Sequence, residues 1–251
     1  MLKLMKYEFR KQAFSKLVIL VLVGLIELLF FFGVASSKEK VIGTSMMLLI
    51  FFTIGALFFL AFESILTYSN DLKLKCSYML FLTPNTSYSI VGAKVLSAGI
   101  QIILAGLAFF AVFALDGAVL IAKYDAIAEV KRMFLELVSQ LFQLDIAFSD
   151  VVSVVAVIIT GWISTITVAF FSITLSTTFL ANSKLKGIVS FAIFIGLNYL
   201  YSYIVDLALE LPTEDMTKIT AYFALYSLFM IGFTIITYVG TAWMLDKKVS
   251  V

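Results

Sequence analysis

Six apolar runs, each long enough to cross a bilayer as a helix, constrain this chain more than any other feature. A span needs about 20 predominantly apolar residues. Inside hydrocarbon such a run must be helical, because only a helix satisfies its own backbone hydrogen bonds without water. The sequence therefore predicts an all-α polytopic membrane protein that forms one transmembrane domain over residues 1–251. The expected spans are Leu17 to Ala35, Val41 to Leu66, Val95 to Ile121, Val151 to Leu180, Gly187 to Leu209 and Thr220 to Leu245.

The composition excludes several kinds of chemistry. Hydrophobic residues make up 62% of the chain, against about 45–50% in soluble domains. The chain has no histidine, the commonest metal ligand and general base, and its single cysteine, Cys76, has no partner for an internal disulfide. We therefore expect no catalytic residues, no bound metal and no nucleic-acid partner.

The basic residues predict how the chain is oriented. With the N-terminus in the cytoplasm, every inner segment is net basic, and the inner segments carry 12 of the 18 lysines and arginines. Lysine and arginine are enriched in cytoplasmic loops. Both termini are therefore expected in the cytoplasm.

Two further segments have the spacing of amphipathic helices. In residues 1–16, Leu2, Met5, Phe9 and Ala13 form an apolar stripe beside lysines and arginine, which predicts a helix along the inner interface. The alternative is a basic leader that only sets topology. Residues 122–150 alternate apolar and charged faces, so we expect an external helix there and no seventh span. It either caps the mouth of a pathway or contacts a partner, or it rests on the outer leaflet.

The predicted inner loop, Thr67 to Lys94, separates two apolar runs and contains a proline and several aromatic residues. A short helix with an apolar, aromatic surface is expected before Pro84, because proline disfavours helix at the residue before it. Thr86 or Ser87 is expected to cap the helix that enters the third span. The aromatics either dock on a partner or lie in the lipid interface.

The segment "LFLTPNTSYSIVGAK" between the second and third spans and the N-terminal segment "KYEFRK" resemble the corresponding segments of the permease subunits of ABC-2 type exporters. In that family the N-terminal segment lies along the inner leaflet, and this loop holds a coupling helix that seats in a separate ATPase subunit. The short bacterial members that act in peptide export or antimicrobial-peptide immunity are the most similar in size. The long outer segment between the third and fourth spans departs from the pattern of many relatives.

The resemblance implies a set of partners and coupling residues. ATPase subunits would bind ATP and magnesium, and a second permease subunit would complete the complex. The complex would be located in the bacterial plasma membrane. The cargo would be an amphipathic peptide or a lipid-like molecule. This chain contains no GxxxxGK[ST] motif, so it cannot hold nucleotide phosphates in a P-loop by itself. The ATPase-coupling residues would be Leu74, Tyr78, Met79, Phe81 and Leu82, with Tyr78 and Phe81 as anchors.

Polar groups inside the spans are candidates for a translocation path. Glu27 lies near the middle of the first span, where an ionised carboxylate costs roughly 2.5–3.5 kcal/mol. Its carboxyl group is either protonated and hydrogen-bonded to a neighbouring helix, or it belongs to a substrate pathway or to a dimer interface. The hydroxyls of the fourth span either pack against a neighbour or form a polar wall. Asp116 is expected at the outer interface, and the other path candidates are Thr160, Ser164, Thr167, Thr174 and Asn198.

Two other classes of function remain open. An ion- or proton-coupled secondary transporter would use Glu27 as its coupling site. A membrane scaffold would transport nothing and would purify without an ATPase.

Overall fold

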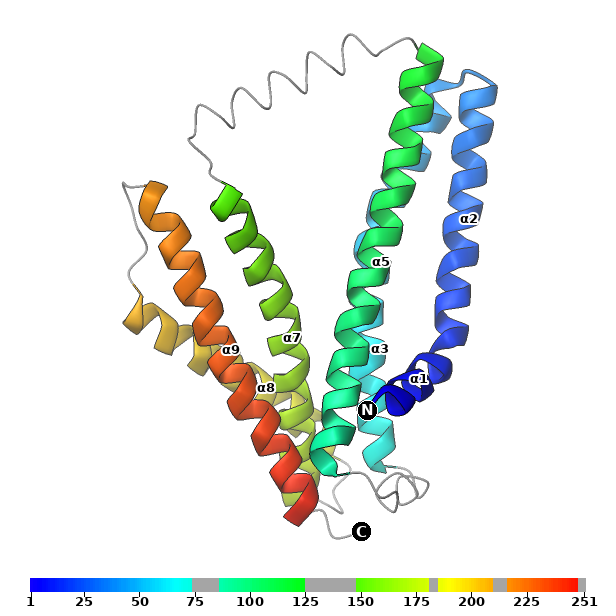
Figure 1. Cartoon of the computed structure of the whole chain (residues 1–251). Coiled ribbons are helices and arrows are strands. Elements are labelled where there is room, and N and C mark those ends of the chain that lie inside the picture. The colour runs from blue at the N-terminus through cyan, green and yellow to red at the C-terminus, as the bar shows by residue number, and fades with distance from the viewer. Residues whose placement is uncertain (74–85, 125–147, 181–184, 210–215, 248–251) are drawn as a thin grey trace. The chain divides into compact units, whose positions relative to one another are not determined.

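The fold is helical throughout the residues that the structure describes, which are 1–73, 86–124, 148–180, 185–209 and 216–247 of this computed structural model. The helices are α1 (Leu2–Lys11), α2 (Ala13–Ala35), α3 (Glu39–Lys73), α5 (Ser87–Tyr124), α7 (Phe148–Phe179), α8 (Lys186–Ala208) and α9 (Met216–Lys247) (Figure 1). Six of them, all but α1, are long and apolar enough to cross a membrane. The predicted all-α polytopic membrane protein is confirmed.

Each predicted span lies within one of these helices to within a residue, but several helices extend beyond their apolar runs. Within the predicted inner segment Thr67–Lys94, α3 continues to Lys73, and α5 begins at Ser87, where the expected cap at Thr86 or Ser87 places its start. Polar residues can continue a helix once it has left hydrocarbon, so hydropathy marks the membrane and not the end of the helix. Thr86 is the cap of α5, as expected, since the Ser89 amide donates to Thr86 Oγ1 at 3.3 Å.

The N-terminal segment is helical but divided. α1 ends at Lys11, and α2 begins at Ala13, where the first long apolar run follows. Gln12 stands between them with φ −101° and ψ 11°. The interfacial helix expected over residues 1–16 is therefore shorter, and residues 13–16 belong to the first spanning helix. Of the external helix expected over 122–150, residues 125–147 lie outside the described residues.

The chain divides into two units, and α3 and α5 contribute to both. The N-terminal unit consists of residues 7–62 and 100–144. Within it α2 lies beside the first part of α3 and the last part of α5 (Figure 1). Its core contains Phe30, Val34 and Ile42, which pack against Met46, Val119 and Leu120.

A tight turn joins α2 to α3 in the N-terminal unit. Ser37 has φ 52°, in the left-handed region, and the Lys38 amide donates to the Gly33 carbonyl at 3.0 Å. This hydrogen bond across the end of a helix is the Schellman pattern, in which the left-handed residue is most often glycine. The turn brings Ile42 back against α2 and closes the core.

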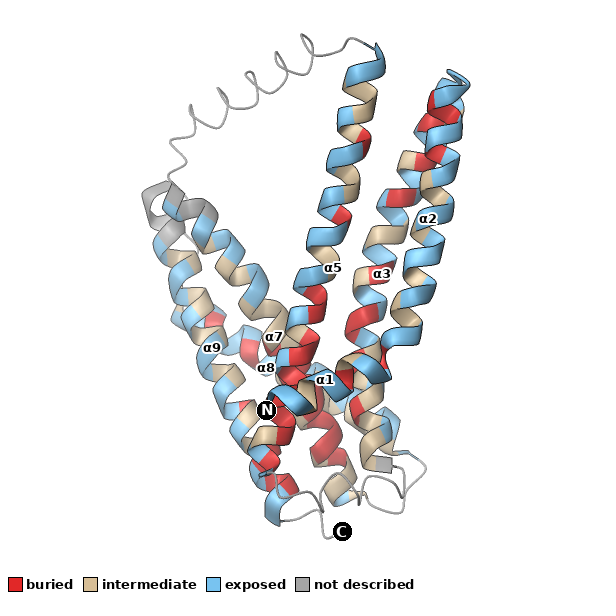
Figure 2. Ribbon diagram, turned by 45° about the vertical axis from the view of Figure 1, so that its right-hand side comes forward, coloured by how far each residue is buried: buried red, intermediate tan, exposed pale blue. Residues whose placement is uncertain are grey.

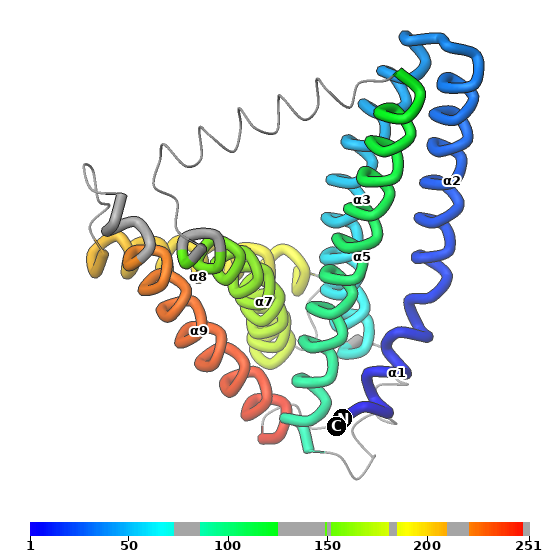
Figure 3. The backbone as a smooth tube through the Cα atoms, turned by 45° about the horizontal axis from the view of Figure 1, so that its top comes forward, coloured from blue at the N-terminus to red at the C-terminus, as the bar shows by residue number. Residues whose placement is uncertain are grey.

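The C-terminal unit consists of residues 1–6, 63–99 and 145–251. In it α7 packs along α9 and also against α8, which runs across it (Figure 3). The buried positions of this unit concentrate in residues 87–98 of α5, 164–176 of α7 and 237–245 of α9 (Figure 2). α7 and α9 approach closely where α9 carries Gly240, since a Cβ there would lie 2.7 Å from the Phe171 ring.

Candidate functional site

The candidate site is the group of contacts that surrounds the segment between α3 and α5. The predicted coupling residues Leu74, Tyr78, Met79, Phe81 and Leu82 lie outside the described residues. The structure does describe the last turns of α3 and the first turns of α5, all of which belong to the C-terminal unit. We call the contacts that these turns make the loop anchor, defined by Tyr68, Asp71, Ser87, Tyr88 and Lys94.

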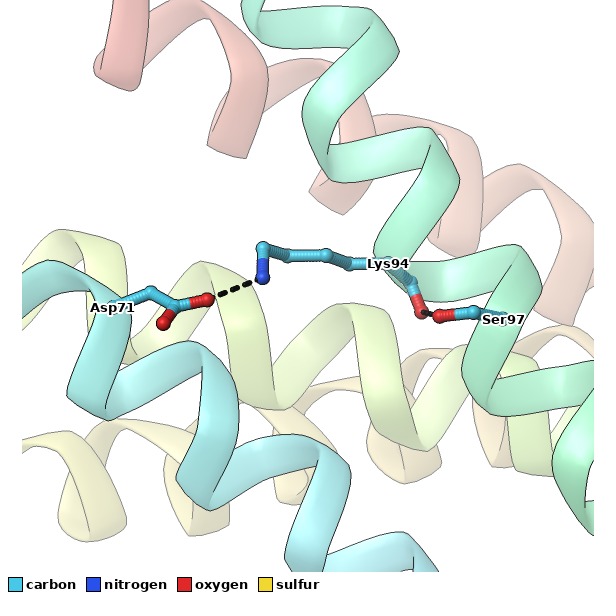
Figure 4. Close-up of polar contacts among 3 residues, drawn as sticks. All are labelled: Asp71, Lys94 and Ser97. Carbon is cyan, nitrogen blue, oxygen red and sulfur yellow. Dashed lines mark hydrogen bonds and ion pairs between the residues drawn. The ribbon is translucent and has the colours of Figure 1, made fainter. Parts of the chain in front are cut away.

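An ion pair joins the two helices of the loop anchor. Lys94 Nζ of α5 lies 2.5 Å from Asp71 Oδ2 of α3, and the two side chains are 5% and 15% exposed (Figure 4). Asp71 is in the last turn of α3, where the helix dipole disfavours a negative charge. The lysine compensates for that position. Ser97 Oγ donates to the Lys94 carbonyl at 2.9 Å, within α5 itself.

Tyr68 connects α3 to α7. Its hydroxyl lies 2.5 Å from Thr174 Oγ1, and its ring stacks on Phe170 with 4.1 Å between centroids. Thr174 Oγ1 gives its own proton to the Phe170 carbonyl at 2.9 Å, so Tyr68 is the donor to Thr174. Both side chains are buried, Tyr68 at 2% and Thr174 at 0% exposure.

Two hydrogen bonds connect the start of α5 to α9. Ser87 Oγ donates to Asp246 Oδ1 at 3.4 Å, and the Tyr238 hydroxyl donates to the Tyr88 carbonyl at 2.8 Å. Gly92, one turn further along α5, permits this approach, because a Cβ there would lie 3.0 Å from the Tyr238 hydroxyl. The helices on both sides of the segment are thus bonded to each other and to α7 and α9 of the C-terminal unit.

The hydroxyls predicted on the fourth span lie on α7 and bond mainly to their own helix. Thr160 donates to Ala156, Thr167 to Ser164, and Thr174 to Phe170, each through the backbone carbonyl. Ser164 is 5% exposed and Thr167 is 1% exposed. This arrangement favours the packing interpretation of the stripe. Asn198 of α8 likewise donates to the Phe194 carbonyl at 2.8 Å.

Glu27 lies in the other unit, on α2, so the predicted path candidates are divided between the two units. Glu27 lies one turn before Phe30, whose core Val119 of α5 also contacts, and Asp116 lies one turn before Val119. Asp116 is 1% exposed. Its side chain is therefore buried within the protein, and its position at the outer membrane interface stays a prediction.

Sequence reasoning also missed the ion pair of the loop anchor. Lys94 was expected on the helix that enters the third span and Asp71 in the inner segment, but nothing in the sequence paired the two, because they are 23 residues apart.

Removal of the hydroxyl contact of Tyr68 tests the link between α3 and α7. In Tyr68→Phe the Thr174 oxygen loses its donor, and we expect the free energy of unfolding in detergent micelles to fall by about 0.6–1.7 kcal/mol, the range of interhelical hydrogen bonds in membranes. Thr174→Val removes the other partner. In a double-mutant cycle the two losses should be less than additive, and additive losses would mean that the two groups do not interact.

Comparison with protein-family models, with characterised proteins and with solved structures finds no match to this chain.

Proposed function

We propose that this chain is the transmembrane permease subunit of an ATP-driven ABC exporter. It would move amphipathic peptides or lipid-like molecules out of the cytoplasm or the membrane. The six spans and the lack of a P-loop motif support a subunit that transports but relies on another chain for its energy. The resemblance of residues 80–94 to the coupling loop of such permeases supports the class.

The loop anchor is the observation that carries the proposal. A segment that receives force from a partner can transmit it only if its ends are fixed to the parts that must move. α3 is joined to α7 by Tyr68, and α5 is joined to α9 by Ser87 and Tyr88. The pair Asp71–Lys94 holds α3 and α5 together. A displacement of residues 74–86 would therefore reach α7 and α9 directly.

The proposed complex contains two permease subunits and two ATPase subunits in a bacterial plasma membrane, with both termini of this chain in the cytoplasm. ATP and magnesium would bind to the ATPase subunits. Closure of the ATPase pair would push on residues 74–82, and the spans would rearrange between inward and outward access. This chain would provide no catalytic residue for ATP hydrolysis.

A test of the proposal replaces the two predicted anchors, Tyr78→Ala and Phe81→Ala together. Tagged wild-type chain is purified from membranes of its native host in mild detergent, and co-purifying proteins and ATP hydrolysis are measured. Wild type should bring down an ATP-binding-cassette subunit. Because buried aromatic anchors each contribute about 2 kcal/mol or more, the double variant should retain less than about a tenth of that subunit and its activity.

The matched control uses two exposed aromatics of α8. Phe191 and Tyr199 are 63% and 74% exposed, so Phe191→Ala with Tyr199→Ala removes the same kinds of side chain from a spanning surface. This variant should bind the ATPase as wild type does. Failure of wild type to capture any nucleotide-hydrolysing subunit would contradict the proposal, and so would full capture by the Tyr78 and Phe81 double variant.

A second candidate, a proton-coupled secondary transporter, is favoured by the buried carboxyl pair of Glu27 and Asp116. The two classes differ in their energy source. Transport that continues without an ATPase subunit and stops when the proton gradient is abolished would support the second candidate.

A further inference from the structure

Two acidic residues from separate helices meet inside the N-terminal unit. Glu27 lies on α2 and Asp116 on α5, each about two turns before the end of its helix. Near those helix ends Lys123 Nζ of α5 donates to Ser37 Oγ, just after α2, at 3.0 Å. The two helices therefore run in register over this region.

Packing on the same stretch fixes the two helices against each other. Phe30 and Val34, one and two turns after Glu27, are in the core that Val119 and Leu120 of α5 also contact. Val119 and Leu120 follow Asp116 by about one turn. The carboxyl groups are thus brought together by helices that are in contact over several turns.

Glu27 and Asp116 each lie one turn before a residue of this shared core, Phe30 and Val119, so the two carboxyl groups stand at the same level on neighbouring helices. Oε1 of Glu27 and Oδ1 of Asp116 are buried without a hydrogen-bond partner. Asp116 as a whole is 1% exposed. Two ionised carboxylates have only acceptor oxygens, so a hydrogen bond between these two groups would require a proton on one of them.

The charged surroundings favour a proton over a metal ion as the ligand. Among the described residues, no third acidic, histidine or cysteine side chain joins the pair. A bare monovalent or divalent cation requires more oxygen ligands than two carboxyl groups provide, since helix carbonyls are already bonded within their helices.

Among the described residues, the other charged side chains at this end of the unit have contacts of their own or are exposed. Lys38 lies over the Phe32 ring, and Lys123 lies over the Tyr124 ring and bonds to Ser37. On α3, Glu39 and Lys40 are exposed in the first turn. A fully ionised pair would therefore place two negative charges in a spanning region with no counter-ion from the described part of the chain, at roughly 2.5–3.5 kcal/mol for each charge.

We propose that Glu27 and Asp116 form a proton-binding site between α2 and α5, in which one proton is held by two carboxyl groups. When the proton leaves to water, the two carboxylates repel each other and their hydrogen bond is lost. When it returns, the bond between the helices forms again. Protonation is thereby coupled to the packing of α2 on α5. The inference does not depend on the proposed export function, because its test uses this chain alone.

The test uses dicyclohexylcarbodiimide, an apolar reagent that reacts with protonated carboxyl groups. The carboxyl O–H adds across one C=N bond of the reagent, and the resulting adduct is located by peptide mass spectrometry. With the full chain in lipid vesicles at neutral pH, we expect an adduct on Glu27 or Asp116 and almost none on Glu39, an exposed carboxylate of α3. When the reaction is carried out in alkaline buffer, we expect almost no adduct on either residue of the pair.

The variant Asp116→Asn keeps the shape and the hydrogen-bonding capacity of the residue but cannot share an acidic proton. It should lower the labelling of Glu27 at neutral pH by about tenfold, as expected if Glu27 alone binds the proton about ten times more weakly than the pair does. Labelling of Glu27 equal to that of Glu39, or labelling that does not change between neutral and alkaline buffer, would overturn the proposal.

Infrared spectroscopy provides a second measurement that does not require a reagent to reach the pair. The C=O stretch of a protonated carboxyl group should be present in wild type at neutral pH and should disappear in alkaline buffer. The double variant Glu27→Gln with Asp116→Asn, whose amides preserve a hydrogen bond, should lack that band while its helical amide band is unchanged. A wild-type protein without the band would refute the site.

Discussion

Replacement of Lys94 by methionine is expected to lower the free energy of unfolding by about 3–5 kcal/mol, because it leaves a largely buried carboxylate without its cation. Lys94 is 5% exposed, and its partner Asp71 is 15% exposed. Methionine preserves most of the length and apolar volume of the lysine side chain. The fall in the free energy of unfolding therefore measures the effect of removing the positive charge. The measurement is denaturant unfolding in detergent micelles, followed by circular dichroism.

A control for Lys94→Met is available on the same helix. Lys123→Met makes the same change at an exposed site, where the ammonium group donates to Ser37, and it should have a much smaller effect. The double variant Lys94→Met with Asp71→Leu removes both charges and should recover most of the lost stability. If Lys94→Met is no worse than Lys123→Met, the ion pair does not hold α3 to α5.

The second large effect is expected from Phe30→Ala in the core of the N-terminal unit. Phe30 is 1% exposed and packs with Val34 and Ile42 where α2 turns back into α3. Removal of a buried phenylalanine side chain leaves a cavity and typically costs about 3–5 kcal/mol. We expect a loss of that size in the free energy of unfolding, measured by the same method.

Phe32→Ala is the matched control for Phe30→Ala, two residues further along the same helix. Phe32 is 57% exposed, and its ring lies 5.7 Å from Lys38 Nζ. Such a contact is worth about 0.5–1 kcal/mol at exposed sites, so this variant should lose no more than that. Equal losses for the two variants would mean that Phe30 is not part of a tightly packed core.

The helices of this protein were predictable from hydropathy because each crossing requires a continuous apolar run. The inner end of α3 was not, since α3 continues to Lys73 through polar residues that the membrane does not specify. The cap at Thr86 was predicted correctly, because a side-chain oxygen before a helix has a local reason to be there. The turn at Ser37 gave no such signal, since glycine and not serine usually occupies a left-handed position.

The contacts of the candidate site depend on residues that are distant in the sequence. Tyr68 and Thr174 have ordinary neighbours along the chain, and only packing of α3 on α7 brings their hydroxyls together. Glu27 was identified as unusual because an acidic residue in a span is costly. Asp116 was not recognised as its neighbour, because it was expected at the outer interface and the sequence does not reveal which helices touch.

The self-bonded hydroxyls of α7 have a chemical consequence for any polar molecule that meets them. Thr160, Thr165 and Thr178 are half-buried, and each donates its proton to the carbonyl four residues earlier. Each oxygen retains lone pairs but has no proton left to give. These hydroxyls of α7 would therefore accept hydrogen bonds from ammonium or amide N–H groups and would offer little to a carboxylate or a phosphate.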